Sequence, residues 1–215
     1  MALSEDTTQL KQGVQELEAE GQQLRQEMER LRLMNQRWAQ LAGTDSLTGL
    51  PNKISCLRAL APQDIQHART RGEAIGFILL SGDNLGPINE NKGRDAGDQV
   101  LRGLAEFLRS ILKGEERLGH LDGSHYAVVL YPAGLEEVRS RAEELRLQIG
   151  VHPFPCAESE ETITASLGIT SVDSSAISEP RSAAEKIFQS LNGALYRAKK
   201  AAGNRIEIAV VDVSL

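Results

Sequence analysis

The chain has 215 residues, 40% of them hydrophobic, which is enough for one domain core of moderate size plus an extension. Its net charge of −6 argues against a nucleic-acid partner, because such binding relies on basic patches that displace phosphate counterions. The cysteines, Cys56 and Cys156, have no CxxC spacing, so we expect neither a zinc site nor a disulfide, and a cytoplasmic location. No apolar run approaches the roughly 20 residues that cross a bilayer, so no membrane segment is expected.

Residues 1–43 carry a heptad pattern typical of one long amphipathic helix. Leucine dominates the d positions, and charged residues flank the seam, which favours a parallel two-stranded coiled coil. The d positions are Leu10, Leu17, Leu24, Leu31 and Trp38, and the a positions are Val14, Gly21, Met28, Asn35 and Ala42. We therefore predict a dimerisation helix over residues 1–43 and a parallel homodimer. The alternative is a single amphipathic helix that packs on its own domain.

Beyond residue 43, strand and helix patterns alternate. Residues 75–80 predict a buried strand and residues 97–112 an amphipathic helix. Residues 117–121 and 125–131 predict a hairpin, closed by Asp122 and Gly123 in a type I′ turn. A helix at 135–149, a strand at 162–170, a helix at 183–201 and a strand at 205–211 follow. Residues 44–215 are therefore predicted to form one α+β domain.

Four short sequence blocks occur in a specific order and spacing. They are DSLTGLPN at residues 45–52, Asn-Glu-x-x-Gly-Arg-x-x-Gly-Asp at 89–98, Ser-Leu-Gly at 166–168 and Ala-Leu-Tyr-Arg-Ala-Lys at 194–199. With these blocks, the chain resembles the GGDEF family of bacterial diguanylate cyclases from about residue 44 to 210. The resemblance implies a nucleotidyl-cyclase-like fold, with a central, mostly antiparallel sheet flanked by helices, and a role in cyclic di-GMP signalling.

In that family, three carboxylates hold the divalent cations used to condense two GTP molecules. The matching positions here are Ser81, Ser124 and His125, and neither a hydroxyl nor an imidazole is a good ligand for magnesium. We therefore predict no catalytic residues, no metal site, and a protein that is not an enzyme. Asp83 and Asp122 leave open a residual cyclase with a displaced metal. No cofactor is expected, except Mg²⁺ if GTP binding uses it.

The resemblance also implies which residues meet the nucleotide. Asn89 and Asp98 match the positions that bind the guanine edge, and Lys199 matches the lysine that meets the phosphates. A carboxylate is suited to guanine because it accepts from two neighbouring N–H donors. The alternative is that Asn89 belongs to a loop turn and that Asp98 stabilises a helix N-terminus.

Many family members bind their product at an Arg-x-x-Asp sequence before the signature. Lys113 and Glu116 stand at those positions here, and Arg146 on the following helix is a candidate second cation. Lysine lacks the planar fork of arginine, so the resemblance implies a remnant cyclic di-GMP site of reduced affinity. The alternative is an ordinary charged surface.

These residues together predict a catalytically inactive GGDEF-like signalling module, dimerised by its coiled coil. It would act as a receptor for GTP or cyclic di-GMP, or as a domain that binds another signalling protein. Two alternatives remain open: a residual diguanylate cyclase, and a pure dimeric scaffold without a ligand.

Overall fold

The structure is a computed structural model that describes residues 13, 17, 20–34 and 43–212. The chain divides into two compact units, Met1–Ala42 and Gly43–Leu215. No helix among the described residues is long and apolar enough to cross a membrane.

Residues 20–34 of the first unit are helical. The large apolar seam residues that the structure describes are exposed, Leu17 by 69%, Leu24 by 66%, Met28 by 53% and Leu31 by 50%, whereas Gly21 is intermediate. The other apolar or polar seam positions, Leu10, Val14, Asn35, Trp38 and Ala42, lie outside the described residues. The described part of this helix therefore presents an uncovered apolar stripe.

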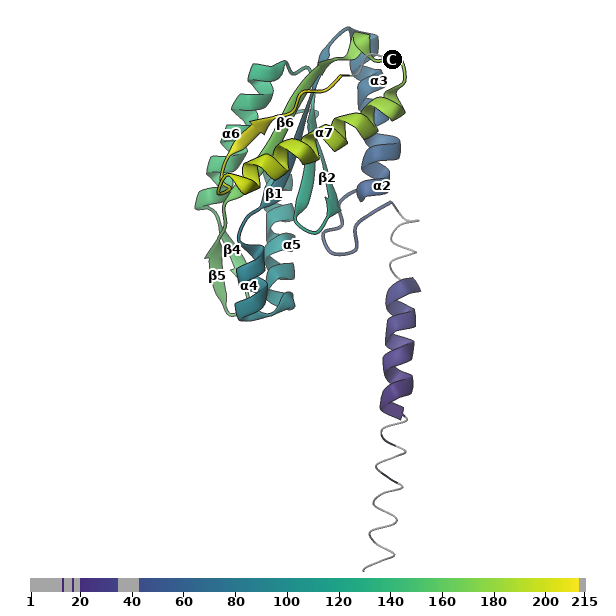
Figure 1. The fold of residues 1–215 in the computed structure, drawn as a ribbon, viewed down its shortest axis with the longest axis vertical. Helices are drawn as coiled ribbons and strands as arrows, with labels where there is room; N and C mark the ends of the chain where they lie inside the picture. Colours follow the sequence, from purple (N-terminus) through teal and green to yellow (C-terminus); the bar gives the residue numbers. More distant parts are fainter. Residues whose placement is uncertain (1–12, 14–16, 18–19, 35–42, 213–215) are drawn as a thin grey trace, which may run out of the picture. The chain divides into compact units, whose positions relative to one another are not determined.

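The second unit is built on a five-stranded sheet with the order β2-β3-β1-β6-β7. The strands are β1 (Ala74–Gly82), β2 (Arg117–Asp122), β3 (His125–Leu130), β6 (Ala165–Asp173) and β7 (Ile206–Ile208). All neighbours pair antiparallel except β6 and β7, which are parallel. The predicted α+β fold with a mostly antiparallel central sheet is confirmed, and Figure 1 shows the long helix α7 (Pro180–Lys200) crossing the sheet.

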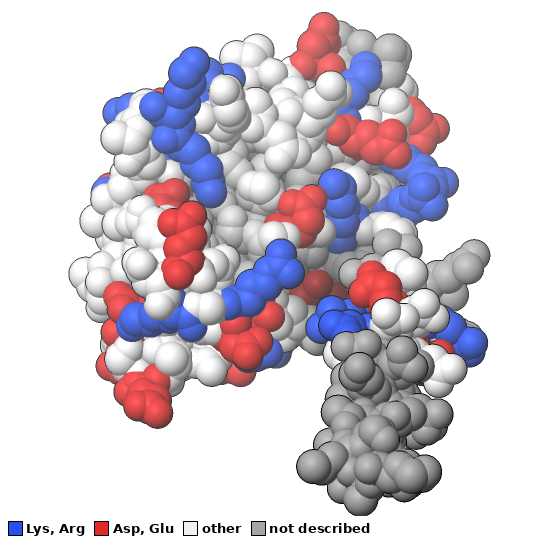
Figure 2. Space-filling view, turned by 60° about the horizontal axis from the view of Figure 1, so that its bottom comes forward, with Lys and Arg blue, Asp and Glu red and all other residues white. Residues whose placement is uncertain are grey.

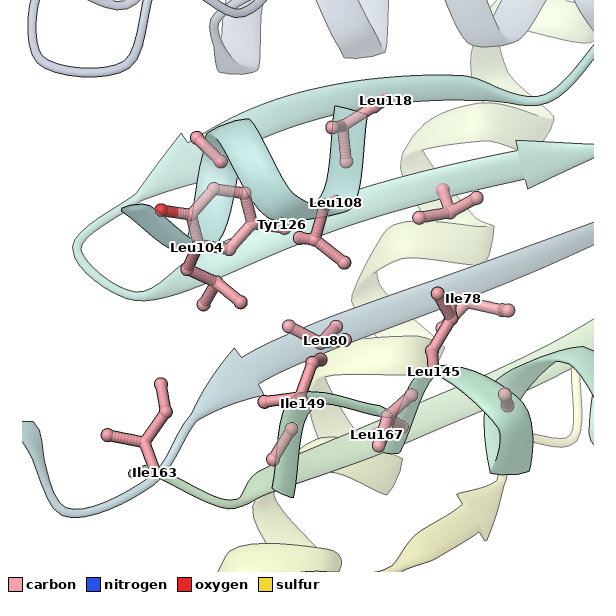
Figure 3. Packing of buried hydrophobic residues seen from close by; sticks show 14 of the residues in the cluster. Ile78, Leu80, Leu104, Leu108, Leu118, Tyr126, Leu145, Ile149, Ile163 and Leu167 are labelled. Carbon is pink, nitrogen blue, oxygen red and sulfur yellow. The ribbon is translucent and has the colours of Figure 1, made fainter. Parts of the chain in front are cut away.

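Helices cover both faces of the sheet. One face packs against α5 (Arg94–Ser110) and α6 (Leu135–Val151), and the other against α3 (Ala61–Arg71) and α7. Strand β1 lies in the middle of the sheet and is apolar on both sides, so its successive residues enter different cores. Figure 3 shows Ile78 and Leu80 of β1 among side chains from α5 and α6.

Several short elements were not predicted. They are α2 (Lys53–Ser55), the π-helical turn η1 (Cys56–Leu60), α4 (Leu85–Lys92), the 3₁₀ turn η2 (Ser174–Ala176) and the hairpin of β4 (Pro153–Cys156) and β5 (Ser159–Thr162). Helix α4 has no buried residue, so it lacks the apolar periodicity that identifies a helix. The strand predicted at 162–170 begins later, at Ala165, because Thr162 ends β5.

The predicted turn at Asp122 and Gly123 is wrong. Asp122 pairs with His125, so the two turn residues are Gly123 and Ser124. Gly123 has a φ of 49°, whereas Ser124 is not among the residues with positive φ. A type I′ turn needs positive φ at both central residues, so this hairpin does not use it. A register shift between His120 and Asp122 moves the turn by one residue.

Candidate functional site

The three positions expected to carry metal-binding carboxylates lie together where the tip of the β2–β3 hairpin meets the end of β1. Ser81, near the end of β1, pairs with His125, the first residue of β3. The Oγ atoms of Ser81 and Ser124 lie 2.6 Å apart, within hydrogen-bonding distance. Ser81 is fully buried, and its hydroxyl is satisfied by the neighbouring serine. Two of the three positions are thus filled by short neutral side chains, those of Ser81 and Ser124, which are hydrogen-bonded to each other.

His125 belongs to a chain of charged contacts on the outside of the hairpin. Its Nδ1 lies 2.7 Å from Oδ1 of Asp122, and Oδ2 of Asp122 accepts from Nζ of Lys53 at 3.1 Å. Burial raises the pKa of Asp122, but the bonds with His125 and Lys53 lower it more, so it lies below its ordinary value. A cavity of about 370 Å³ lies beside these charged contacts, and its lining includes Leu57 and Phe188.

The residues present do not fit a pair of magnesium ions. Asp83 accepts hydrogen bonds from the hydroxyls of Thr164 and Ser166 and from the backbone N–H of Asn204. The donor–acceptor distances are between 2.9 and 3.0 Å. Asp122 is engaged with Lys53 and His125. The described residues contain no group of three or more His, Cys, Asp or Glu arranged to hold a metal ion. Both carboxylates that could support a displaced metal therefore already have protein partners.

The residues expected to bind guanine come together at the junction of α4 and α5. Asn89 lies on the exposed side of α4, and Asp98 is half-buried in the first turns of α5. Gly97 permits this approach, because a Cβ there would lie 1.9 Å from Oδ1 of Asn89. The Asn89 amide therefore lies against the residue that precedes Asp98 in the sequence.

Lys199, expected to meet the phosphates, reaches the same end of the sheet from α7. Its Nζ lies 3.5 Å from the carbonyl oxygen of Gly82, which directly follows Ser81. Burial lowers the pKa of Lys199 more than the charge of Asp83 raises it. The structure thus places a cation at the end of β1, beside Gly82.

A histidine that the sequence had not singled out anchors the hairpin. His120 is 3% exposed; its Nε2 donates to the carbonyl of Gly123 at 2.8 Å, and its Nδ1 lies 2.9 Å from Oδ1 of Asp45. Burial raises the pKa of Asp45, but hydrogen bonds from Thr48 and His120 lower it more. Asp45 is the first residue of the DSLTGLPN block, and that block was the sequence signal that could have pointed to this contact. This contact ties that block to the signature turn.

The candidate product site is only partly assembled. Glu116 binds Arg141 of α6 through two contacts of 2.8 Å, and Lys113 binds Glu144 at 2.6 Å. Arg146 contacts neither Lys113 nor Glu116. It pairs instead with Glu143 of α6 and with Asn204, which precedes β7. The structure therefore does not bring Arg146 together with Lys113 and Glu116; the α6 residues that contact them are Arg141 and Glu144.

Comparisons with known proteins agree with this architecture. The described structure superposes on the coiled coil and GGDEF domain of DgcB from Caulobacter crescentus, solved in complex with c-di-GMP, with a TM-score of 0.67 and 24% identity. That superposition covers 90% of this chain and 99% of the other. At this identity it shows the fold alone, which is that of a GGDEF domain.

The family follows from the sequence comparison. The family model described as "Diguanylate cyclase, GGDEF domain" matches residues 42–205, so the chain belongs to the GGDEF family. The diguanylate cyclase DgcP of Pseudomonas aeruginosa is 35% identical over 170 residues, or 79% of this chain and 24% of DgcP. A diguanylate cyclase of Vibrio cholerae is 31% identical, over 77% of this chain and 49% of that protein. The chain thus spans half or less of the length of these curated relatives.

These relatives correct one prediction. We predicted a protein that is not an enzyme, from the missing carboxylates at Ser81, Ser124 and His125. The family model is one of diguanylate cyclases, and both relatives are named as such enzymes. The comparisons therefore point to an enzyme family and contradict that prediction. The chain is a GGDEF domain of the cyclic di-GMP signalling type.

Proposed function

We propose that this GGDEF domain binds guanine nucleotide, with GTP as the ligand of Asn89, Asp98 and Lys199. The observation that carries the proposal is the close approach of the Asn89 amide to Gly97, the residue that precedes Asp98 on α5. A carboxylate accepts from the two N–H groups on the guanine edge, and an amide supplies one donor and one acceptor. Adenine offers a different edge, so this pair favours GTP over ATP.

Lys199 supports the phosphate end of the same ligand. Its ammonium lies at the end of β1, beside Gly82 and near the neutral pair of Ser81 and Ser124, and the carboxylate of Asp83 is the anion that acts on it. An ammonium held beside a phosphate group gives a charge-assisted hydrogen bond, which is stronger than a neutral one. Nucleotide binding in this arrangement needs no metal ion, and Mg²⁺ enters only as the usual companion of GTP.

The experiment is a calorimetric titration of GTP into the wild type and into Asp98→Ala and Asn89→Ala. We expect saturable binding by the wild type and a loss of about tenfold or more in affinity for Asp98→Ala, since hydrogen bonds to charged groups contribute about 1.5–3 kcal/mol. Gln99→Ala is a neighbouring control on α5 and is expected to bind GTP normally. Equal GTP affinity of Asp98→Ala and the wild type would contradict the proposal. A flat trace for the wild type would favour the pure scaffold.

A second candidate function is diguanylate cyclase activity, which the names of the relatives favour. It is tested by incubating the protein with GTP and Mg²⁺ or Mn²⁺ and measuring cyclic di-GMP chromatographically. The triple variant Ser81→Asp/Ser124→Asp/His125→Glu restores the acidic residue types at the three positions and serves as the comparator. Product from the wild type supports the second candidate. Product from the variant alone assigns the difference to these three side chains.

We also propose that the N-terminal helix forms a parallel homodimer. The exposed stripe of Leu17, Leu24, Met28 and Leu31 supports it, because such a leucine seam is stable only when a second helix covers it. The neighbour from DgcB is likewise described as a coiled coil with a GGDEF domain. Sedimentation of Leu24→Glu/Leu31→Glu is expected to give a monomer, with Gln26→Ala, on the opposite side of the helix from the seam, as a dimeric control. A dimeric double variant would contradict this assignment.

A cytoplasmic location and a protein partner remain predictions from the sequence. The remnant product site is not part of the proposal, because Lys113 and Glu116 are both bound to α6 side chains or to each other.

A further inference from the structure

A cavity of about 460 Å³ lies between α6 and the edge strand β7. Its lining includes three arginines, Arg139, Arg146 and Arg205, and one carboxylate, that of Glu143. On the face shown in Figure 2, acidic and basic side chains are interspersed, and the chain as a whole carries a net charge of −6. Three cations with one anion around a single hollow therefore depart from the charge pattern of this protein.

Arg146 forms a fixed wall of the cavity. Its Nε and Nη2 bind the two carboxylate oxygens of Glu143 at 2.8 and 2.6 Å, and its Nη1 donates to Oδ1 of Asn204 at 2.6 Å. The bonds with Glu143 raise the pKa of Arg146. Because Arg146 and Glu143 neutralise each other, the excess positive charge belongs to the other two arginines.

Arg139 and Arg205 are weakly engaged. Within the second unit as described, Arg139 makes no hydrogen bond or ion pair, although its charge acts on Glu143. Arg205 has only a contact of 3.4 Å with the carbonyl of Ala201 and a distance of 4.0 Å to Glu207. Most of the N–H donors of both guanidinium groups are therefore available to a ligand.

The same cavity has an apolar side. Ile206 and Ile208 of β7 line it, and Ile208 is 42% exposed. An exposed isoleucine beside free guanidinium groups suits a ligand with an anionic end and an apolar end. A volume of several hundred Å³ is in the range of small-molecule sites.

We propose that this cavity binds a small organic phosphomonoester, with its phosphate between Arg139 and Arg205 and its apolar part against Ile206 and Ile208. A phosphate dianion matches two guanidinium forks, each of which can give two parallel hydrogen bonds. This site is separate from Asn89, Asp98 and the hairpin tip, and it does not depend on GTP binding there.

The test uses phenyl phosphate as the probe, titrated calorimetrically into the full chain. The wild type is expected to bind it saturably, and Arg139→Ala and Arg205→Ala are each expected to bind it about tenfold more weakly or worse. Arg109→Ala removes an exposed arginine of α5 and is the matched control, expected to bind like the wild type. Inorganic phosphate is expected to bind more weakly than phenyl phosphate, because it gains nothing from the isoleucines.

Three results would overturn the proposal: no saturable binding of phenyl phosphate by the wild type, equal losses in Arg109→Ala and Arg139→Ala, or equal affinities for inorganic and phenyl phosphate. Urea midpoints of all variants identify any that fail to fold, and Arg139→Lys then provides a folded variant that keeps the charge without the fork. Arg139→Ala is expected to keep the GTP affinity of the wild type, which separates this site from the proposed nucleotide site.

Discussion

The two halves of the candidate nucleotide site differ in how they are held. At the α4–α5 junction, the Asn89 amide lies against Gly97, Asn89 is exposed, and the adjacent Asp98 is half-buried. At the hairpin tip, Ser81 and Ser124 bond to each other, and His125 bonds to Asp122. The first half is open to a ligand, whereas the second is closed by contacts within the protein.

The difference shows that strand pairing at the hairpin does not depend on acidic side chains at its tip. The hairpin remains in register with β1, with Ser81 opposite His125, and His120 still ties its turn to Asp45. Backbone pairing depends on strand pattern and turn residues, so it tolerates the exchange of charged for neutral side chains at the tip. Base recognition requires particular donors and acceptors, and we propose that Asn89 and Asp98 supply them at the other half.

The largest expected effect comes from Asp83, which lies between the two halves. Asp83→Ala removes the acceptor of three hydrogen bonds and is expected to lower the free energy of unfolding by about 3 kcal/mol, because hydroxyl and amide donors lose a charged partner. Urea unfolding followed by circular dichroism measures it. Glu106→Ala, an exposed change on α5, is the control. Equal midpoints for the two variants would show that these three hydrogen bonds do not stabilise the fold.

Gly97→Ala tests the half of the site that is proposed to bind the guanine base. The new methyl would displace the Asn89 amide, so the affinity for GTP is expected to fall about tenfold, a loss of roughly one hydrogen bond to the ligand. Stability should change little, because the exposed Asn89 side chain can rotate away. Gly86→Ala on α4 meets no atom within 4 Å and is the matched control. Unchanged GTP affinity in Gly97→Ala would break the link between this approach and binding.

Ser81→Ala tests the half of the site at the hairpin tip. Loss of the contact with Ser124 is expected to lower the free energy of unfolding by about 1 kcal/mol, the typical net contribution of one hydrogen bond. A double-mutant cycle with Ser124→Ala measures the coupling between the two hydroxyls. Additive effects of the two substitutions would mean that the pair contributes nothing to closing this half.

The smallest expected effect is a dependence of stability on acid. The folded pKa of Asp122 lies below its ordinary value of 3.8. Its contribution is therefore complete above the unfolded pKa and is lost as the pH falls through the lower folded pKa. Asp122→Asn is expected to flatten the fall of the urea midpoint below about pH 4. An unchanged acid profile in Asp122→Asn would separate this carboxylate from hairpin stability.

The sequence was most informative where periodicity is strong. The buried strand β1 and the amphipathic helices α5 and α7 were predicted because their apolar residues repeat at strand or helix spacing. Helix α4 and the β4–β5 hairpin were missed, since short exposed elements carry no such signal.

Within the site, the sequence identified positions but not contacts. Asn89 and Asp98 were named from their spacing, yet the role of Gly97 between them follows only from the packing of α4 on α5. Arg146 was named as a second cation because it lies on the helix that follows Lys113 and Glu116, and only the rotation of α6 shows that Arg141 is the arginine that contacts Glu116. The turn of the hairpin shifted because a register irregularity at His120 is invisible in the residue pattern.

The measurement that tests the central claim most directly is a calorimetric titration of the wild-type protein with GTP and with ATP, each with Mg²⁺ and with EDTA. The account predicts saturable GTP binding that persists in EDTA, and ATP binding at least about tenfold weaker, because only guanine offers both N–H donors to Asp98. Equal affinities for GTP and ATP, or GTP binding that vanishes in EDTA, would contradict an open base-recognising half beside a hairpin that holds no metal.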